Sequence, residues 1–391
     1  MKTKKVQARQ KDSRDITLFL CGDVMTGRGI DQILPHPSNP ILYESYMRDA
    51  RGYVEIAEAA YGPIPRPVDF SYIWGDALAE LEHTAPDLRI INLETSITVS
   101  PDYWPGKGIN YRMHPANAPV FNTAKIDLCV LANNHVLDWG YAGLDETLAT
   151  LQKLKVERVG AGRNVKEAAA PALLQVPGKG RVIVFSMGSP TSGIPYDWAA
   201  TANRPGVNFL HRFSDQAIRN IKGQVQVLRQ AGDIIVFSIH WGDNWGYAIS
   251  DEQRQFAHRL IDEAGVDLIY GHSSHHVMGI EVYRQRPILY GCGDFLNDYE
   301  GISGHEQYRG DLALIYFVSM DPASGELSAL RMRPTQTRNL KVNRASQADG
   351  RWLRDTLNRE GKELNSRVEL TQDNTLILRW NKQPKTPQTK D

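Results

Sequence analysis

The chain has 391 residues, of which 41% are apolar and 23% are charged, a balance typical of a globular protein with a sizeable core. Its 45 basic and 45 acidic residues cancel, which excludes a nucleic-acid-binding protein that relies on bulk positive charge. No apolar stretch after the basic N-terminus is long enough for a signal peptide or a membrane helix, so we expect a cytoplasmic protein without a membrane anchor.

The two ends of the chain differ in composition from the rest. Residues 1–13 and 381–391 are polar and contain several lysines, so we predict disordered tails on either side of a single domain, residues 14–380. Within that domain the cysteines Cys21, Cys129 and Cys292 are irregularly spaced and lie in apolar surroundings. We expect them to be reduced, buried thiols.

Short apolar runs recur along the domain, and each breaks off into glycine or a polar residue. The runs suit strands buried on both faces and read ITLFLCGD, LRIINLET, IDLCVLANNH, IIVFSIHWG and VDLIYGHSSHH. Helix-period stretches lie between them: GLDETLATLQKLK follows the third run, and DEQRQFAHRLIDEAG, with Ser250 and Asp251 as cap candidates, follows the fourth. The alternation predicts an α/β fold with central sheets, whose polar strand ends gather at one edge.

Other segments of the domain lack this alternation. Residues 32–86 contain many prolines and no clear strand, so we expect an insertion of loops with a helix around residues 72–82. Residues 312–343 predict a hairpin, and residues 346–365 predict a helix. A closing hairpin around Asp373 and Asn374 completes the domain near residue 380.

Polar side chains that can bind metal stand at the ends of the predicted strands. They comprise two carboxylates, one amide and four imidazoles, namely Asp23, Glu94, Asn134, His135, His240, His272 and His275. A lone histidine after a strand is ordinarily structural, but the convergence of several strand ends favours a site for a divalent metal ion. A mixed nitrogen and oxygen set suits Zn, Mn or Fe, while oxygen-only sets suit Ca or Mg, and the sequence does not resolve the ion.

The same residues belong to motifs that resemble those of the CapA family. GDVMTGRG, INLETSIT, LANNHVLDWG, GAGRN, IHWGDNW and GHSSHHVMGIEVY…PILYGCGDF occur in the family's order and spacing, over roughly residues 16–320. CapA proteins are linked to capsule and poly-γ-glutamate synthesis. The resemblance implies a metallophosphoesterase (calcineurin-like) fold, a four-layer α-β-β-α sandwich with loop insertions. It also implies His135 as a proton donor and a set of metal ligands, which are Asp23, Glu94 as the bridging carboxylate, Asn134, His240, His272 and His275.

Two positions depart from the pattern that this resemblance implies. Met25 occupies the place of a second ligand in the first motif, and a thioether is a poor ligand for a hard or borderline cation. We therefore expect one firm metal site and a weaker second one, which weakens the case for two-metal phosphoester cleavage. Asp294 stands where the family usually has Asn. It is expected to act as a base or to orient a metal-bound histidine, with a turn-capping role as the structural alternative.

Basic residues near the predicted strand ends are candidates for substrate binding. Arg28 follows the first strand and Arg112 lies in GINYRMH, and either side chain can hold a carboxylate or phosphate group. The structural alternative for each arginine is an ion pair within the protein. Lys107 lies in a glycine-rich loop and is interpreted as solvated.

Aromatic residues and a further histidine occupy the predicted loops around the site. Trp104, Trp139, Trp241 and Trp245 lie in or near the motifs, which predicts an aromatic wall around an organic substrate, although some of them must pack in the core. His305 follows the YEGISG loop, and we expect it to reach the rim of the site as a second proton donor.

Three functions stay open at this point. The first is metal-activated hydrolysis or transfer on a small anionic or peptide substrate, such as a carboxylate-bearing or poly-γ-glutamate-like molecule. The second is epimerisation at a peptide Cα, a reaction known among CapA-like proteins, with Asp23, Asp294 and His305 as acid and base groups. The third is a non-catalytic accessory role in capsule or polyglutamate synthesis. The sequence does not indicate the oligomeric state.

Overall fold

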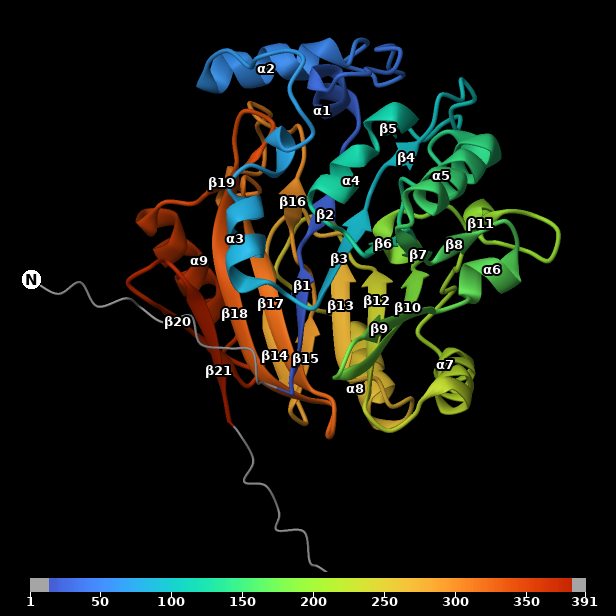
Figure 1. Ribbon diagram of the computed structural model, residues 1–391, viewed down its shortest axis with the longest axis vertical. Coiled ribbons are helices and arrows are strands. Elements are labelled where there is room, and N and C mark those ends of the chain that lie inside the picture. The colour runs from blue at the N-terminus through green and yellow to red at the C-terminus, as the bar shows by residue number, and fades with distance from the viewer. Residues whose placement is uncertain (1–13, 382–391) are drawn as a thin grey trace, which may run out of the picture.

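The computed structural model describes residues 14–381 and contains two large β-sheets with helices around them (Figure 1). The predicted tails lie outside the described residues, except for Asn381. The first sheet has eleven strands, and its main path runs β16-β2-β3-β1-β17-β18-β21-β20. These strands are β1 (Ile16–Leu20), β2 (Asp23–Val24), β3 (Leu88–Leu93), β6 (Leu128–Val130), β7 (Glu157–Val159), β16 (Asp294–Leu296), β17 (Leu312–Asp321), β18 (Glu326–Thr337), β19 (Val342–Arg344), β20 (Ser366–Leu370) and β21 (Leu376–Trp380).

The second sheet has six strands in the order β14-β15-β13-β12-β10-β9. They are β9 (Ala172–Val176), β10 (Gly180–Gly188), β12 (Asp233–His240), β13 (Leu268–His272), β14 (Ile280–Tyr283) and β15 (Arg286–Leu289). The four central strands, from β15 to β10, are parallel, as expected for apolar strands joined by helical segments. Two short pairs complete the strands: β4 (Ser96–Ile97) with β5 (Arg112–Met113), and β8 (Ala161–Gly162) with β11 (Gly206–Val207).

The two sheets pack face to face, and apolar side chains alternate between their two surfaces. On β1, Leu18 joins a core cluster shared by both sheets, while Phe19 joins a cluster on the outer side of the first sheet. On β12, Val236 joins the shared cluster, while Phe237 packs with α7 and α8 on the outer side of the second sheet. Because central strands such as β1 and β12 are covered on both faces, they are apolar on both sides, as their sequences predict, whereas the edge strand β9 alternates between buried and exposed residues.

The helices cover the outer faces and edges of the sheets, and several follow the predicted boundaries. They are α1 (Arg28–Ile33), α2 (Arg51–Tyr61), α3 (Ala77–Thr84), α4 (Pro119–Thr123), α5 (Gly140–Leu154), α6 (Val165–Ala169), α7 (Asp215–Leu228), α8 (Asp251–Asp262) and α9 (Gln347–Glu360). The predicted start of α8 is confirmed, because Ser250 and Gln253 form a reciprocal capping box at its first turn.

The segment expected to hold a helix at 72–82 differs in detail. A 3₁₀ turn, Tyr72–Trp74, precedes α3, and Gly75 separates the two with φ +45°. A Cβ at Gly75 would lie 2.1 Å from the carbonyl oxygen of Val342, so the close approach of β19 breaks the helix at this glycine. The region predicted as a hairpin contains β17 and β18, which pair antiparallel, and β20 pairs with β21 in the same way.

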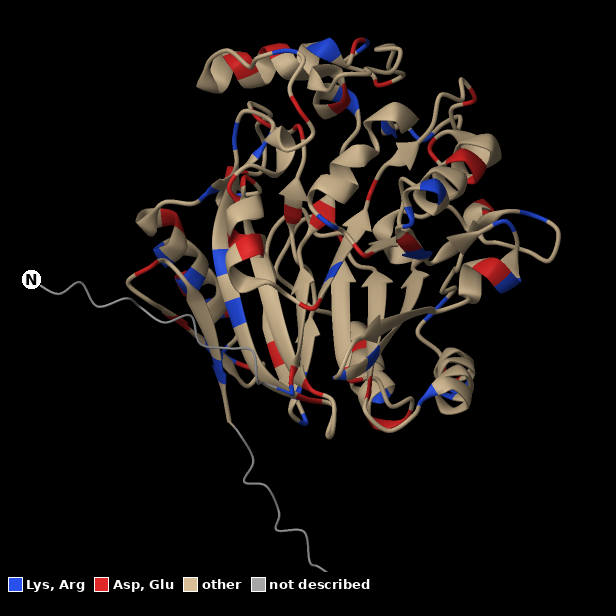
Figure 2. Ribbon diagram, in the orientation of Figure 1, with Lys and Arg blue, Asp and Glu red and all other residues tan. Residues whose placement is uncertain are grey.

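Charged residues of both signs are interspersed over the helices and loops (Figure 2), in keeping with the net charge of zero. Within residues 14–381, no helix combines the length and the apolar character that crossing a bilayer demands. The expectation of reduced cysteines is confirmed: Cys21, Cys129 and Cys292 are all buried and free.

Candidate metal centre

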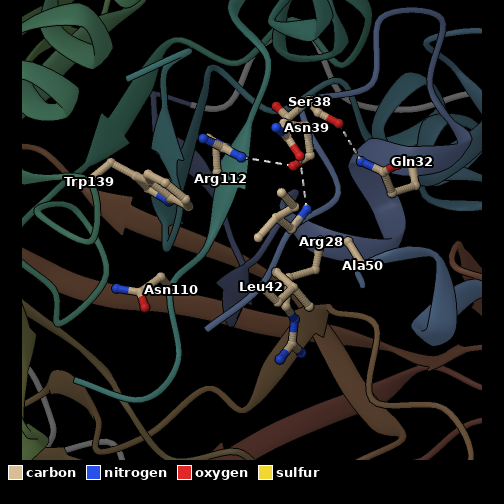
Figure 3. A pocket seen from close by; sticks show the side chains of 10 residues that line it. Arg28, Gln32, Ser38, Asn39, Leu42, Ala50, Asn110, Arg112 and Trp139 are labelled. Atoms are coloured by element: carbon tan, nitrogen blue, oxygen red, sulfur yellow. Dashed lines mark hydrogen bonds between the residues drawn. The ribbon is translucent and has the colours of Figure 1, made fainter. Parts of the chain in front are cut away.

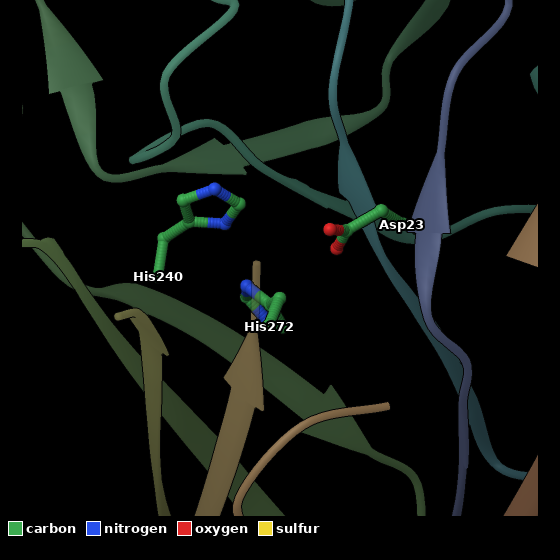
Figure 4. Close-up of side chains that lie close together, drawn as sticks. All are labelled: Asp23, His240 and His272. Carbon is green, nitrogen blue, oxygen red and sulfur yellow. The ribbon is translucent and has the colours of Figure 1, made fainter. Parts of the chain in front are cut away.

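The carboxylate of Asp23 lies among donor atoms contributed by both large sheets. One ligand atom each from Asp23, His240 and His272 lie within 4.8 Å of one another (Figure 4). Asp23 also forms a second group of this kind with Glu94 and Asp294. All five side chains are buried. Asp23 is therefore the residue that the two groups share. The family resemblance implied Glu94, and not Asp23, as the bridging carboxylate.

Strand register explains why residues so distant in sequence meet here. His240 and His272 are paired positions at the carboxyl ends of parallel strands β12 and β13. In the first sheet, Asp294 on β16 pairs with Asp23 on β2 in parallel. Strands β2 and β16 approach closely here because Gly22 has no side chain: a Cβ there would lie 1.9 Å from the carbonyl oxygen of Gly293. The polar ends of both sheets consequently face one small space.

Hydrogen bonds fix the orientation of Asp23. The Nδ2 of Asn92 donates to its Oδ1 at 2.8 Å, and the backbone amide of Ser273 approaches its Oδ2 at 3.3 Å. Asn133 in turn donates to the Oδ1 of Asn92 at 3.0 Å, so the asparagine that holds Asp23 is itself held. This buried chain of amides keeps the carboxylate in one position without neutralising it.

His240 and His272 each have a ring nitrogen without a hydrogen-bond partner among the described residues. Nε2 of His240 lies 3.1 Å from the Oδ1 of Asn134 and 3.8 Å from the Oε1 of Glu94. Nε2 of His272 lies 3.0 Å from the hydroxyl of Ser238. Among the described residues, the buried Nδ1 atoms of His240 and His272 have no hydrogen-bond partner. Buried polar atoms are ordinarily satisfied, so unpartnered imidazole nitrogens indicate room for a ligand.

The electrostatics of the site fit a cation. Burial, and next the charge of Asp294, raise the pKa of Asp23 to about 7. Burial and the charge of Asp23 likewise raise the pKa of Glu94. Burial lowers the pKa of His272 to about 3, and it also lowers that of His240, so both rings are neutral at pH 7. Neutral imidazoles and mutually repelling carboxylates form a donor set that a divalent metal ion would stabilise.

His135 lies beside this donor set, and its ring is held by a contact with Asp138. Its Nδ1 is 2.6 Å from the Oδ2 of Asp138, and its Nε2 is 3.8 Å from the Oε1 of Glu94. Asp138 also pairs with Lys107, whose Nζ lies 2.7 Å from its Oδ1. Since an ionised carboxylate only accepts, Nδ1 carries the proton and Nε2 presents its lone pair toward the site. Burial lowers the pKa of His135 to about 4, which keeps the ring neutral.

His275 and Asp294 form a second acid–base pair close to Asp23. Nδ1 of His275 lies 2.8 Å from the Oδ2 of Asp294. Burial by itself lowers the pKa of His275, but the charge of Asp294, the hydrogen bond to it and the charge of Asp23 together outweigh burial, so the pKa is raised. The two groups of converging donors found in the described residues include Asp294 but not His275. The structure thus brings His275 to the site as a partner of Asp294, and its role as a ligand stays a prediction.

Met25, at the place of a missing ligand, is buried in the protein. Its Sδ accepts a hydrogen bond of 3.2 Å from the backbone amide of Gly27. The thioether therefore has a local structural partner.

The two arginines are committed to partners within the protein. Arg28 is 2% exposed, its Nη1 lies 2.9 Å from the Oε1 of Glu44, and its Nε lies 3.2 Å from the Oδ2 of Asp298. Arg112 donates to the carbonyls of Ser100 and Asn39 at 3.0 and 2.8 Å. The structure therefore favours the ion-pair alternative for Arg28. Arg112 bonds backbone carbonyls of neighbouring loops, so neither arginine is free to bind a substrate as expected.

Arg112 nevertheless lines a small cavity (Figure 3). Its guanidinium carbon lies 3.7 Å from the ring centre of Trp139, and both residues line the cavity together with Asn110. Trp139 is 2% exposed and donates from Nε1 to the carbonyl of Tyr111 at 3.1 Å. These two residues form part of the wall of this cavity, which none of the converging donors lines.

The other tryptophans divide between the core and the rim. Trp241 is buried, stacks on Tyr290 and packs in the cluster on the outer side of the second sheet, so it is a core residue and not part of an aromatic wall. Trp245 stacks on His275 with ring centres 5.3 Å apart, and on the exposed ring of His305 at 4.1 Å. The structure thus brings Trp245 and His305 to the rim next to His275.

Sequence reasoning missed the residues that support the site. Lys107, interpreted as solvated, is largely buried and bonded to Asp138, because its loop folds over His135. Asp138 follows His135 by three positions in LANNHVLDWG, a spacing that could have marked it. Asn92, by contrast, precedes the motif glutamate inside a strand and offers no comparable signal.

Comparisons with known proteins show the family of the chain. Residues 17–299 match the family described as "Bacterial capsule synthesis protein PGA_cap". A probable polyglutamine synthesis accessory protein of Mycobacterium tuberculosis (strain CDC 1551 / Oshkosh) is 50% identical over 92% of this chain and 95% of its own length. The PGA biosynthesis protein CapA of Bacillus subtilis (strain 168) is 28% identical over 71% of this chain and 62% of its own length.

A further relative is the capsule biosynthesis protein CapA of Bacillus anthracis, which is 24% identical over 74% of this chain and 62% of its own length. The family match covers Asp23, Glu94, His240 and His272, so the converging donors all lie inside it. The chain belongs to the PGA_cap family of bacterial capsule synthesis proteins, the CapA-type family.

Proposed function

We propose that this capsule-synthesis family protein is a metal-dependent enzyme that acts on a carboxylate-bearing peptide or a poly-γ-glutamate-like substrate by hydrolysis or transfer. The observation that carries the proposal is the convergence of buried donors on Asp23, which forms one group with His240 and His272 and a second group with Glu94 and Asp294. A purely structural cluster would bury these carboxylates at a cost and gain little from them. We also propose that the two packed sheets are of the metallophosphoesterase type.

Asp23, Glu94, Asn134, His240 and His272 would hold the metal ion, with His275 or Asp294 completing a second, weaker site. When bound, a divalent cation polarises a carbonyl or phosphoryl oxygen and stabilises the negative charge that develops there. Asn92 fixes Asp23 for this purpose, and the Oδ1 of Asn134 lies 3.1 Å from Nε2 of His240.

His135 would transfer the proton. Asp138 holds Nδ1 of the ring, so Nε2 takes a proton from an attacking group or returns it to a leaving group. The ion pair with Lys107 holds Asp138 in place, which preserves this tautomer. The stack of His135 on Tyr111, with ring centres 3.8 Å apart, holds the imidazole plane.

Epimerisation at a peptide Cα is a second candidate. The pair formed by His275 and Asp294 gives the site an acid–base group in addition to His135 and Asp138, and epimerisation needs two such groups. A non-catalytic accessory role is a third candidate, since the printed name of the mycobacterial relative describes it as an accessory protein.

Metal content tests the proposal most directly. Elemental analysis of purified wild type should find a divalent transition metal, and Glu94→Ala and His240→Ala should lose it. Asp49→Ala, which removes an exposed carboxylate, is the matched control. Absence of metal binding in the wild type, even after incubation with Mn²⁺ or Zn²⁺, would favour the accessory role.

The reaction class needs a separate measurement. Metal-loaded protein is incubated with γ-linked glutamate oligomers and peptides in deuterated water, and the products are analysed by mass spectrometry. Chain shortening or transfer supports the proposal, whereas deuterium at Cα without cleavage supports epimerisation.

A further inference from the structure

A second cavity, which we call the outer cavity, opens between residues 43–48 and 103–110. Its volume is about 290 Å³. Tyr43 and Tyr103 stack on one another with ring centres 3.6 Å apart and line it together with Trp104. Both tyrosines are 38% exposed, so the parts of the rings outside this stack remain accessible to a bound molecule. The cavity therefore offers aromatic surfaces of the kind that pack against an organic chain.

Arg48 gives the outer cavity a positive charge that the protein leaves free. It is exposed, and among the described residues its guanidinium has no ion pair or hydrogen bond. The neighbouring Asp49 does not neutralise it, because Asp49 binds Arg51 through an Nε–Oδ1 contact of 2.9 Å. A guanidinium in this state can bind a carboxylate in a bidentate manner.

The loop that lines the outer cavity also contacts the candidate metal centre. The backbone of Gly106 and Gly108 lines the cavity and faces open space. Between them, Lys107 turns inward, and its Nζ lies 2.9 Å from Nδ1 of His135. Asn110, which lines both this cavity and the small one beside Arg112, donates to the carbonyl of Asp138 at 3.1 Å. One short loop thus separates the free arginine from the group that would transfer the proton.

We propose that the outer cavity is a subsite for a neighbouring carboxylate-bearing unit of an extended polyglutamate-like substrate whose reacting unit lies at Asp23. Arg48 binds the carboxylate of that unit, and the rings of Tyr43 and Tyr103 pack against its methylene groups. The inference rests on the proposed function for its substrate class, and it adds a requirement for chain length: a single glutamate cannot occupy both places.

Isothermal titration calorimetry on the full chain tests this subsite, with glutamate and a γ-linked glutamate oligomer as probes. The oligomer should bind the metal-loaded wild type more tightly than glutamate. Arg48→Ala should weaken oligomer binding by about tenfold, the loss of one charged hydrogen-bonding group, and should leave glutamate binding unchanged. Tyr103→Ala should weaken the oligomer selectively as well. Arg51→Ala is the matched control, because Arg51 is exposed and paired with Asp49, and it should bind both probes like wild type.

The outcomes separate this inference from the proposed function. Equal oligomer affinity in wild type and Arg48→Ala, or an oligomer that binds no better than glutamate, overturns the subsite even if metal binding and turnover are intact. Oligomer binding that depends on Arg48 and persists in Glu94→Ala supports the subsite. If the wild type then holds no metal, the proposed function fails while the subsite stands.

Discussion

The carboxylate of Asp23 should make the stability of the metal-free protein depend on pH. In the folded protein its pKa is about 7, against an ordinary value of 3.8. As the pH rises, Asp23 therefore loses its proton at a lower pH in the unfolded chain than in the folded protein. Ionisation then stabilises the unfolded state, and the free energy of unfolding falls. The contribution of protonated Asp23 to the free energy of unfolding is complete below about pH 4 and is lost as the pH rises through about 7.

The size of this effect follows from the shift. Roughly three pKa units correspond to about 4 kcal/mol of differential stability between the protonated and ionised forms. Asp23→Asn removes the charge but keeps a side-chain oxygen that can accept the hydrogen bond from Asn92. In metal-free protein the variant should therefore match wild type near pH 4 and exceed it by up to about 4 kcal/mol near pH 8.

Urea unfolding of EDTA-treated protein across this pH range measures the difference. Asp49→Asn is the control, since Asp49 is exposed and Arg51 lowers its pKa, so its effect should be flat above about pH 4. Metal ion at about a hundred times its Kd should restore roughly 2.7 kcal/mol to wild type and much less to Asp23→Asn. A difference between wild type and Asp23→Asn that does not change with pH would refute the reasoning.

Three further substitutions test other parts of the structure. Arg28→Ala should lower the free energy of unfolding by about 3–5 kcal/mol in urea titrations, because it leaves buried Asp298 without its partner; unchanged stability with a raised KM would instead indicate substrate binding. His135→Ala should retain metal in elemental analysis but lower kcat by about 10²–10⁴-fold, and an unchanged rate would exclude it as the proton-transfer group. Trp241→Ala should lower the free energy of unfolding by about 3–5 kcal/mol, because it leaves a cavity in the core. Trp245→Ala, at the rim, should change KM more than stability. The reverse pattern in unfolding and kinetic assays would contradict the division between core and rim.

Local pattern was sufficient to identify most of the converging donors. Asp23, Glu94, His240 and His272 each follow an apolar run, and a run covered on both faces has to stop where its side chains become charged. Parallel strands end at one edge of a sheet, so their terminal polar residues meet there whatever the loops do.

Local pattern could not tell which polar groups are already paired. Arg28 looked like a free cation after a strand, but its partner Asp298 lies 270 positions along the chain. Lys107 looked solvated because its neighbours are glycines, but its loop folds onto Asp138. Such pairings depend on the register between distant segments, which no spacing in the sequence records.

The sequence by itself determined the α/β class, the strand ends and the chemical types gathered there, because these follow from the periodicity of apolar residues over short stretches. Tertiary structure alone decided that both donor groups share Asp23 and that Trp241 packs in the core. It also decided that Arg48, beside an open cavity, has no ion pair with any residue from 14 to 381. The reason is that burial and pairing are properties of the space between segments: a side chain is charged, neutral, free or bound according to what the rest of the fold places next to it.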